Sequence, residues 1–121
     1  MKKLLIVDDQ QLYLKSLEFA LRKKYQVLTA ENYSEALLHL KNDNVDIALI
    51  DIRLDEDDTE NIDGLKILEW IKMNKPQIAC FVMSAYKEFI YAEQALNLGA
   101  RHFFRKPIDI VSLTAILEDK A

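Results

Sequence analysis

The chain has 121 residues, which is enough for one hydrophobic core and too few for two ordinary domains. Half of the residues are apolar and 30% are charged, a composition typical of a globular protein. The formal net charge of −4 argues against a broad nucleic-acid-binding or anionic-membrane-binding surface. The first apolar run stops at Asp8, too early for a signal peptide or a membrane span, so we expect a cytoplasmic protein.

Strand and helix patterns alternate along the chain. Apolar runs predict five strands, over residues 4–7, 26–30, 46–50, 78–83 and 102–104. After each strand, apolar residues recur at helical spacing; the inward-facing ones are expected to be Leu14, Leu17 and Leu21; Ala36, Leu37 and Leu40; Leu65, Leu68 and Ile71; Phe89, Ala92, Ala95 and Leu96; and Leu113, Ile116 and Leu117. Five such repeats predict a flavodoxin-like, doubly wound α/β fold. Its five-stranded parallel sheet would have the order 2-1-3-4-5, with helices on both faces.

Several helix ends are marked by residues with a defined local role. Asn32, followed three residues later by Glu35, predicts a capping box at the start of the second helix. Asp109 is placed to cap the last helix. Pro76 marks the end of the third helix and Gly99 fits the C-terminal turn of the fourth.

Reactive side chains stand where four of the predicted strands end. Asp8 and Asp9 follow the first run, Asp51 the third, Ser84 the fourth and Lys106 the fifth. Parallel strands end on one edge of the sheet, and ligands bind outside that edge, so these side chains are expected to converge. Clustered carboxylates repel one another and favour a hard divalent cation such as Mg²⁺. A lysine and a hydroxyl opposite them suit a transferred phosphoryl group.

These motifs together resemble the receiver domain of two-component response regulators. The resemblance extends from Lys3 to about Leu117, and the segment from Ser84 to Asp109 is particularly similar to receivers of NtrC-like transcription activators. We therefore expect one receiver domain over residues 1–121, as the N-terminal part of a longer regulator. The motifs that carry the resemblance are Asp8-Asp9 after LLIV, Asp51 after IALI, Ser84-Ala85 after FVM, and Lys106-Pro107 after FF.

The resemblance implies a chemical role for each residue of the predicted site. Asp51 would accept a phosphoryl group from a sensor histidine kinase or a phosphotransfer protein. Asp9 and Asp51 would bind Mg²⁺ directly, Asp8 mostly through water, and the backbone carbonyl of Arg53 would add a ligand. Lys106 would pair with a phosphoryl oxygen as a point charge. The chain would thus be a phosphoacceptor that promotes its own phosphorylation and dephosphorylation, and not a classical enzyme.

The resemblance also implies a switch and an output surface. Ser84 would hydrogen-bond the phosphoryl group, and Phe103, which lacks the hydroxyl of the tyrosine common in the family, would then turn inward. The fourth helix, fifth strand and fifth helix would form the output face for an output domain or a second copy of the chain. We expect Ile90 and Tyr91 to lie on the outward side of the fourth helix as contact residues. No direct nucleic-acid contact and no membrane contact is expected of this domain.

The segment after Asp51 departs from the family pattern. Receivers usually carry a proline and then a glycine soon after the phosphoacceptor, whereas here the proline is missing and Gly64 comes thirteen residues on. The intervening loop, Asp55–Asp63, is rich in carboxylates. Such a run is ordinarily a solvated surface loop. Alternatively, carboxylates within a Debye length of the site would concentrate Mg²⁺ and oppose an anionic donor.

Two other functional classes are compatible with parts of the pattern. A Mg²⁺-dependent phosphohydrolase would also use an aspartate nucleophile, but such enzymes typically carry an acid/base aspartate two residues later, where this chain has Arg53. A pseudo-receiver would act only as a binding module, which the intact Asp8-Asp9 pair, Asp51 and Lys106 argue against. A nucleotide-binding phosphate loop of the GxxxxGK[ST] or GxGxxG kind is absent from the sequence.

Overall fold

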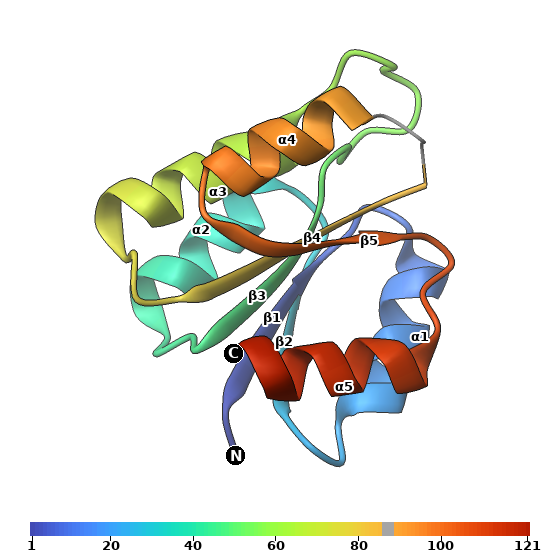
Figure 1. Cartoon of the computed structure of the whole chain (residues 1–121), viewed down its shortest axis with the longest axis vertical. Helices are drawn as coiled ribbons and strands as arrows, with labels where there is room; N and C mark the ends of the chain where they lie inside the picture. The colour runs from blue at the N-terminus through green and yellow to red at the C-terminus, as the bar shows by residue number, and fades with distance from the viewer. Residues whose placement is uncertain (86–88) are drawn as a thin grey trace.

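The computed structural model describes residues 1–85 and 89–121, with only the backbone described at positions 89 and 90. Strands and helices alternate through this part of the chain (Figure 1). Because each strand is followed by a helix, neighbouring strands can all run in the same direction. The elements are β1 (Lys3–Val7), α1 (Gln11–Leu21), β2 (Gln26–Ala30), α2 (Tyr33–Asn42), β3 (Ile47–Asp51), α3 (Asp63–Asn74), β4 (Ala79–Ser84), α4 (Phe89–Asn97), β5 (Ala100–Arg105) and α5 (Ile110–Lys120).

The strands form a parallel sheet in the order β2-β1-β3-β4-β5, which confirms the predicted topology. The chain moves outward from β1 to β2, then returns to the other side of β1 with β3. The strand order therefore reverses between β1 and β3, and ligands of open α/β sheets bind beyond the carboxyl ends of the strands at such a point. Asp8 extends β1 toward this edge, because its backbone N–H donates to the carbonyl of Ala30 at 3.0 Å.

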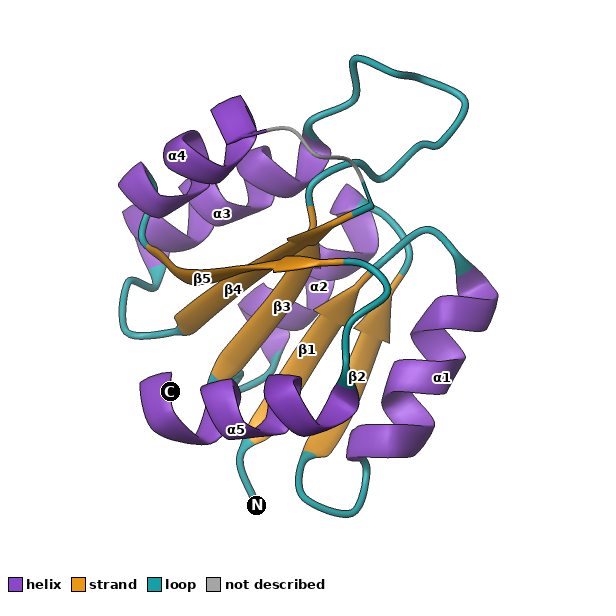
Figure 2. Ribbon diagram, turned by 45° about the vertical axis from the view of Figure 1, so that its right-hand side comes forward, coloured by secondary structure: helices purple, strands orange, loops and turns teal. Residues whose placement is uncertain are grey.

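Helices cover both faces of the sheet (Figure 2). On one face, Leu4 and Ile6 of β1 pack with buried residues of α1 and α5. On the other, Leu5 and Val7 pack with buried residues of α2, α3 and α4. Because both faces are buried, the central strands are continuous apolar runs and lack the polar–apolar alternation of a half-exposed strand.

The helix and strand ends are close to those predicted. Asn32 accepts a hydrogen bond from the backbone N–H of Glu35 at 2.9 Å, and Asp109 caps α5 by accepting from the N–H of Ser112 at 3.0 Å. Gly99 has φ 99°, as expected of a helix C-terminal glycine. β3 and β4 each begin and end one residue later than predicted, and β5 is longer at both ends. β5 is an edge strand with exposed polar residues, so its apolar pattern understates its length.

The orientation of α4 differs from the prediction. Leu96, expected to face the core, is 51% exposed. Tyr91, expected to face outward, is half-buried and packs against the core together with Ala95 and Leu98. These three residues are spaced four and three apart and therefore share a helix face. α4 is apolar over most of its circumference, so the apolar pattern alone does not define which side meets the sheet. The side chains of Phe89 and Ile90 lie outside the described residues.

Among the described residues, every helix is too short or too polar to cross a membrane.

Candidate functional site

The predicted site residues meet at the carboxyl edge of the sheet, where β1 and β3 lie side by side. Asp8 and Asp9 follow β1, and Asp51 is the last residue of β3. One carboxylate oxygen from each of these three residues lies within 4.8 Å of the others. Asp51 is more than 40 residues from Asp8 and Asp9 in the sequence. The three residues meet because the parallel strands that precede them end on the same edge of the sheet.

Lys106 places a single ammonium group inside this carboxylate cluster. Its Nζ is 2.7 Å from Asp8 Oδ2 and 3.2 Å from Asp51 Oδ2, and its side chain is only 6% exposed. The backbone N–H of Lys106 donates to the carbonyl of Ser84 at 2.9 Å, so β4 fixes the position from which the lysine reaches in. The ring of Tyr13 lies 4.7 Å from the ammonium and adds a cation–π contact. Lys106 therefore joins β1, β3 and β4 at the site.

The cluster holds more negative than positive charge and is largely buried from water. Burial raises the pKa of Asp51 to about 7; Lys106 opposes this shift, whereas the charges of Asp8 and Asp9 add to it. Burial, followed by the charge of Asp8, raises the pKa of Asp9. Burial by itself lowers the pKa of Lys106, but attraction to Asp51 and Asp8 raises it above its usual value. One ammonium faces three carboxylates, so a further cation would stabilise their ionised forms.

The hydrogen bonds of the carboxylates leave oxygens available to such a cation. Asp8 Oδ1 accepts from the N–H of Gln10 at 2.9 Å, and Asp9 Oδ2 accepts from the N–H of Glu56 at 3.1 Å. Asp9 Oδ1 is buried and accepts no hydrogen bond from any residue that the structure describes. A buried carboxylate oxygen without a donor is costly unless a cation binds it. The oxygen-only donor set fits Mg²⁺, which prefers carboxylate, carbonyl and water ligands.

Ser84 and Phe103 occupy β4 and β5 next to the carboxylate cluster. Ser84 ends β4 and is buried, and its register partner in β5 is Arg105. Phe103 pairs with Val82 and packs, half-buried, against the core on the α2–α4 face. The structure thus places the predicted hydroxyl one residue beyond Met83, the register partner of Asp51. The predicted aromatic lies on the neighbouring strand.

Gly64 supports the backbone on which Asp51 stands. A Cβ at this position would lie 2.0 Å from the carbonyl oxygen of Asp51 and 2.6 Å from the Cα of Ile52. The N–H of Gly64 also donates to the carbonyl of Ile52 at 2.9 Å. Only glycine lets the first turn of α3 approach the end of β3 this closely. Sequence reasoning noted the spacing of Gly64 but missed this contact, and it did not identify Gln10, Tyr13 or Glu56 as neighbours of the site.

Arg53, two residues after Asp51, is 8% exposed, so this backbone segment lies against the body of the domain. The acidic loop begins just beyond it, and residues 55–60 are exposed. The side-chain oxygen of Asn61 accepts from the N–H groups of Leu54 and Asp63, both at 3.0 Å, and so closes the loop at its base. The loop extends past the carboxyl edge of the sheet (Figure 2).

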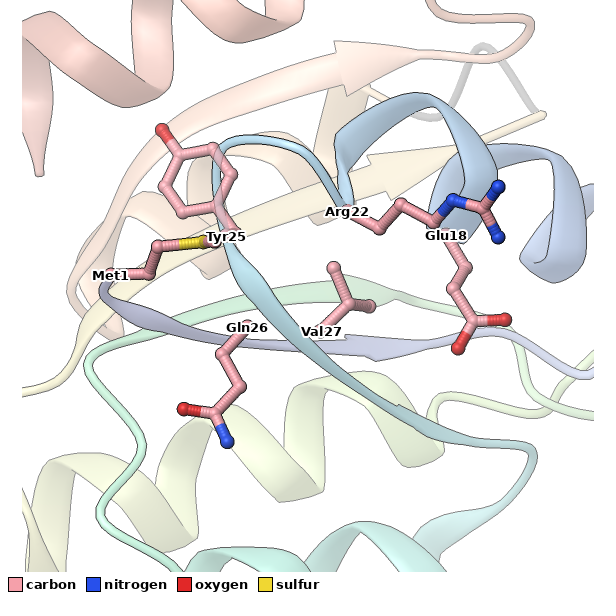
Figure 3. A pocket seen from close by; sticks show the side chains of 6 residues that line it. All are labelled: Met1, Glu18, Arg22, Tyr25, Gln26 and Val27. Atoms are coloured by element: carbon pink, nitrogen blue, oxygen red, sulfur yellow. The ribbon is translucent and has the colours of Figure 1, made fainter.

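A separate surface hollow of about 640 Å³ lies at the opposite edge of the sheet, where β2 begins (Figure 3). It is remote from Asp51, because parallel strands start and end on opposite edges. None of the predicted site residues lines this hollow. The residues that line the hollow are Met1, Glu18, Arg22, Tyr25, Gln26 and Val27.

Comparison with known proteins identifies the family of this chain. Residues 4–118 match the family model of the response regulator receiver domain. The chain is 34% identical over 116 residues to the transcriptional regulatory protein ZraR of Escherichia coli, an NtrC-family activator, covering 95% of this chain and 25% of that protein. The chain thus spans about a quarter of the length of the transcriptional regulatory proteins that it matches.

The solved structures that share the fold include two response regulator proteins. One is a CheY-like receiver domain protein from Methanospirillum hungatei, with TM-score 0.90, 27% identity and coverage of 99% of this chain and 93% of that chain. The other is a response regulator from Burkholderia pseudomallei with a phosphorylated aspartic acid and a calcium ion, with TM-score 0.83, 27% identity and coverage of 95% of this chain and 65% of that chain. The match over residues 4–118 and the shared fold show that the chain belongs to the response regulator receiver domain family of two-component systems.

Proposed function

We propose that this chain is a phosphorylation-dependent switch in which Asp51 accepts a phosphoryl group from a phosphohistidine of a sensor histidine kinase or phosphotransfer protein. The observation that carries the proposal is the position of Asp51. It is buried at the sheet edge, 3.2 Å from the Lys106 ammonium and beside Asp8 and Asp9. The phosphorylated aspartic acid described for the Burkholderia relative supports the same chemistry here.

The transfer replaces one bond with another. An ionised oxygen of Asp51 attacks the phosphorus, and a P–O bond forms as the P–N bond to the histidine breaks, with the electron pair remaining on the imidazole. Asp51 must be ionised to attack, and because its pKa lies at about 7 it is partly protonated near neutrality. Bound Mg²⁺ would favour the ionised carboxylate and offset the charge on the phosphoryl oxygens. Asp9, Asp51 and the carbonyl of Arg53 would hold it directly, and Asp8 mostly through water.

Lys106 and Ser84 would report the new charge to the rest of the domain. In the unphosphorylated chain, Lys106 is held by Asp8 and Asp51. A phosphoryl oxygen on Asp51 would become its partner instead, as a charge-assisted contact. Ser84 would donate its hydroxyl to another phosphoryl oxygen, and Phe103 on the adjacent strand would turn inward. The equilibrium between the two states can shift only as far as their difference in partner affinity allows.

The conformational change would be transmitted to a partner through the face formed by α4, β5 and α5. We propose an output domain or a second copy of the chain as its partner, with Ile90 as a contact residue, and Tyr91 contributing only through its exposed edge. The domain would be the N-terminal part of a longer cytoplasmic regulator of transcription. The transcriptional regulatory proteins with which it shares about a third of its residues support this proposal.

A direct experiment tests the phosphoacceptor. Incubation with Mg²⁺ and acetyl phosphate should add one phosphoryl group, measured by intact-protein mass spectrometry, and Asp51→Asn should abolish the addition. Asp119→Asn, which removes an exposed carboxylate at the end of α5, is the matched control and should be phosphorylated normally. Full modification of Asp51→Asn, or an equal rate in excess chelator, would contradict the proposal.

A further inference from the structure

Glu56, in the acidic loop between β3 and α3, contacts two residues of the β1–α1 connection at the site. Its backbone N–H donates to Asp9 Oδ2 at 3.1 Å, and its carboxylate accepts from the side-chain amide of Gln10. The amide oxygen of Gln10 in turn accepts from Lys106 Nζ at 3.3 Å. An unbroken series of contacts therefore connects the loop to the ammonium group that lies 3.2 Å from Asp51.

The shape of the loop is defined by its own hydrogen bonds. Besides the closure by Asn61 at its base, the N–H of Asp58 donates to the carbonyl of Asp55, and the N–H of Asn61 donates to the carbonyl of Asp58, both at 3.1 Å. These turns hold the loop in a compact form without help from the sheet. Asp55, Asp57, Asp58 and Glu60 are exposed, whereas the carboxylate of Glu56 is directed toward the β1–α1 connection. Glu56 thus has a structural partner that a purely solvated loop would not provide.

The contact with Gln10 matters because Lys106 has to change partners. A phosphoryl group arriving at Asp51 takes the position at Lys106 Nζ that carboxylate oxygens and the Gln10 amide oxygen hold now. While Glu56 holds the amide of Gln10, the Gln10 oxygen remains on Lys106. Release of Lys106 toward the phosphoryl group therefore competes with the Gln10–Glu56 hydrogen bond.

We infer that Gln10 and Glu56 form a clasp that holds Lys106 on the Gln10 amide oxygen and slows phosphorylation of Asp51 by small donors. The inference rests on the proposed phosphoacceptor role of Asp51. Glu56 acts on the reaction as a positioning residue, through Gln10 and Asp9. Loss of one hydrogen bond to a charged group on the surface corresponds to a change of about fivefold in the equilibrium between closed and open forms.

Kinetic measurements on four proteins test the clasp. The rate of phosphorylation by acetyl phosphate is measured at saturating Mg²⁺ and about 0.5 M salt, which screens simple charge repulsion. Glu56→Ala should accelerate phosphorylation about fivefold. Glu56→Gln keeps an acceptor for the Gln10 amide without the charge and should stay within about twofold of the wild type. Glu60→Ala is the control, since its carboxylate makes no hydrogen bond with the described residues, and it should leave the phosphorylation rate unchanged.

Hydrogen exchange tests the clasp in the unphosphorylated protein, independently of the phosphorylation reaction. The amide of residue 56 is hydrogen-bonded to Asp9, so Gln10→Ala should speed its hydrogen exchange about fivefold in the unphosphorylated protein, and Glu60→Ala should not. Equal acceleration by Glu56→Ala, Glu56→Gln and Glu60→Ala would show a charge effect and overturn the clasp. Equal rates in all four proteins would overturn it too, while phosphorylation of Asp51 would still stand. A wild-type protein that never accepts a phosphoryl group at Asp51 would refute the proposed function itself.

Discussion

Gly64 offers the sharpest test of how the fold supports the site. In Gly64→Ala, the added Cβ would lie 2.0 Å from the carbonyl oxygen of Asp51, 2.6 Å from the Cα of Ile52 and 2.8 Å from the carbonyl carbon of Asp51. All three neighbours are backbone atoms at the end of β3, so no side chain can rotate away to make room. The first turn of α3 must therefore move away from the strand that carries Asp51.

The expected cost combines two effects. Overpacking against a rigid neighbour typically costs about 1–3 kcal/mol. Displacement of α3 also weakens the hydrogen bond from the Gly64 N–H to the Ile52 carbonyl, now 2.9 Å, for about 1 kcal/mol more. Gly64→Ala should thus lower the free energy of unfolding by about 2–4 kcal/mol, measured by urea denaturation with a common m-value. The displaced backbone should also slow phosphorylation of Asp51.

Gly99→Ala is the matched control for this prediction. Gly99 has φ 99°, but a Cβ there would meet nothing within 4 Å. Its substitution should cost only the strain of the left-handed conformation, about 1–2 kcal/mol, and leave phosphorylation unchanged. If Gly64→Ala is no less stable than Gly99→Ala and is phosphorylated at the wild-type rate, the argument from close approach is wrong.

Three further predictions concern the candidate site. Because the folded-state pKa of Asp51 is raised to about 7, the native protein binds more protons than the unfolded chain between about pH 4 and 7. In chelator, stability should fall as the pH rises through this window, and Asp51→Asn should flatten the slope in urea titrations. Asp9→Ala should weaken Mg²⁺ binding, measured by calorimetry, more than Asp8→Ala; equal losses would remove the distinction between direct and water-mediated ligands. Ser84→Ala should still accept a phosphoryl group, but beryllofluoride should then shift the amides near Phe103 less than in the wild type, and wild-type shifts would break the proposed link.

Local sequence determined the sheet and the convergence of the site. Apolar runs buried on both faces specify central parallel strands, and alternation with helical patterns specifies crossovers on both sides. Once the strands are parallel, the residues that follow them must share one edge. For that reason Asp8, Asp9, Asp51 and Lys106 were identified as neighbours without any contact being known, and the structure places them within a few ångströms of one another.

Other features depend on contacts between segments that are distant in sequence, and only the tertiary structure shows them. The orientation of α4 was mispredicted because most of its surface is apolar, and packing on the sheet turns Tyr91 inward and Leu96 outward. The need for glycine at position 64 arises from a backbone that passes close by in space. The contact between Glu56 and Asp9 spans 47 residues of sequence. Propensity and periodicity act over a few residues, whereas these contacts exist only after the sheet has brought the ends of β1 and β3 together.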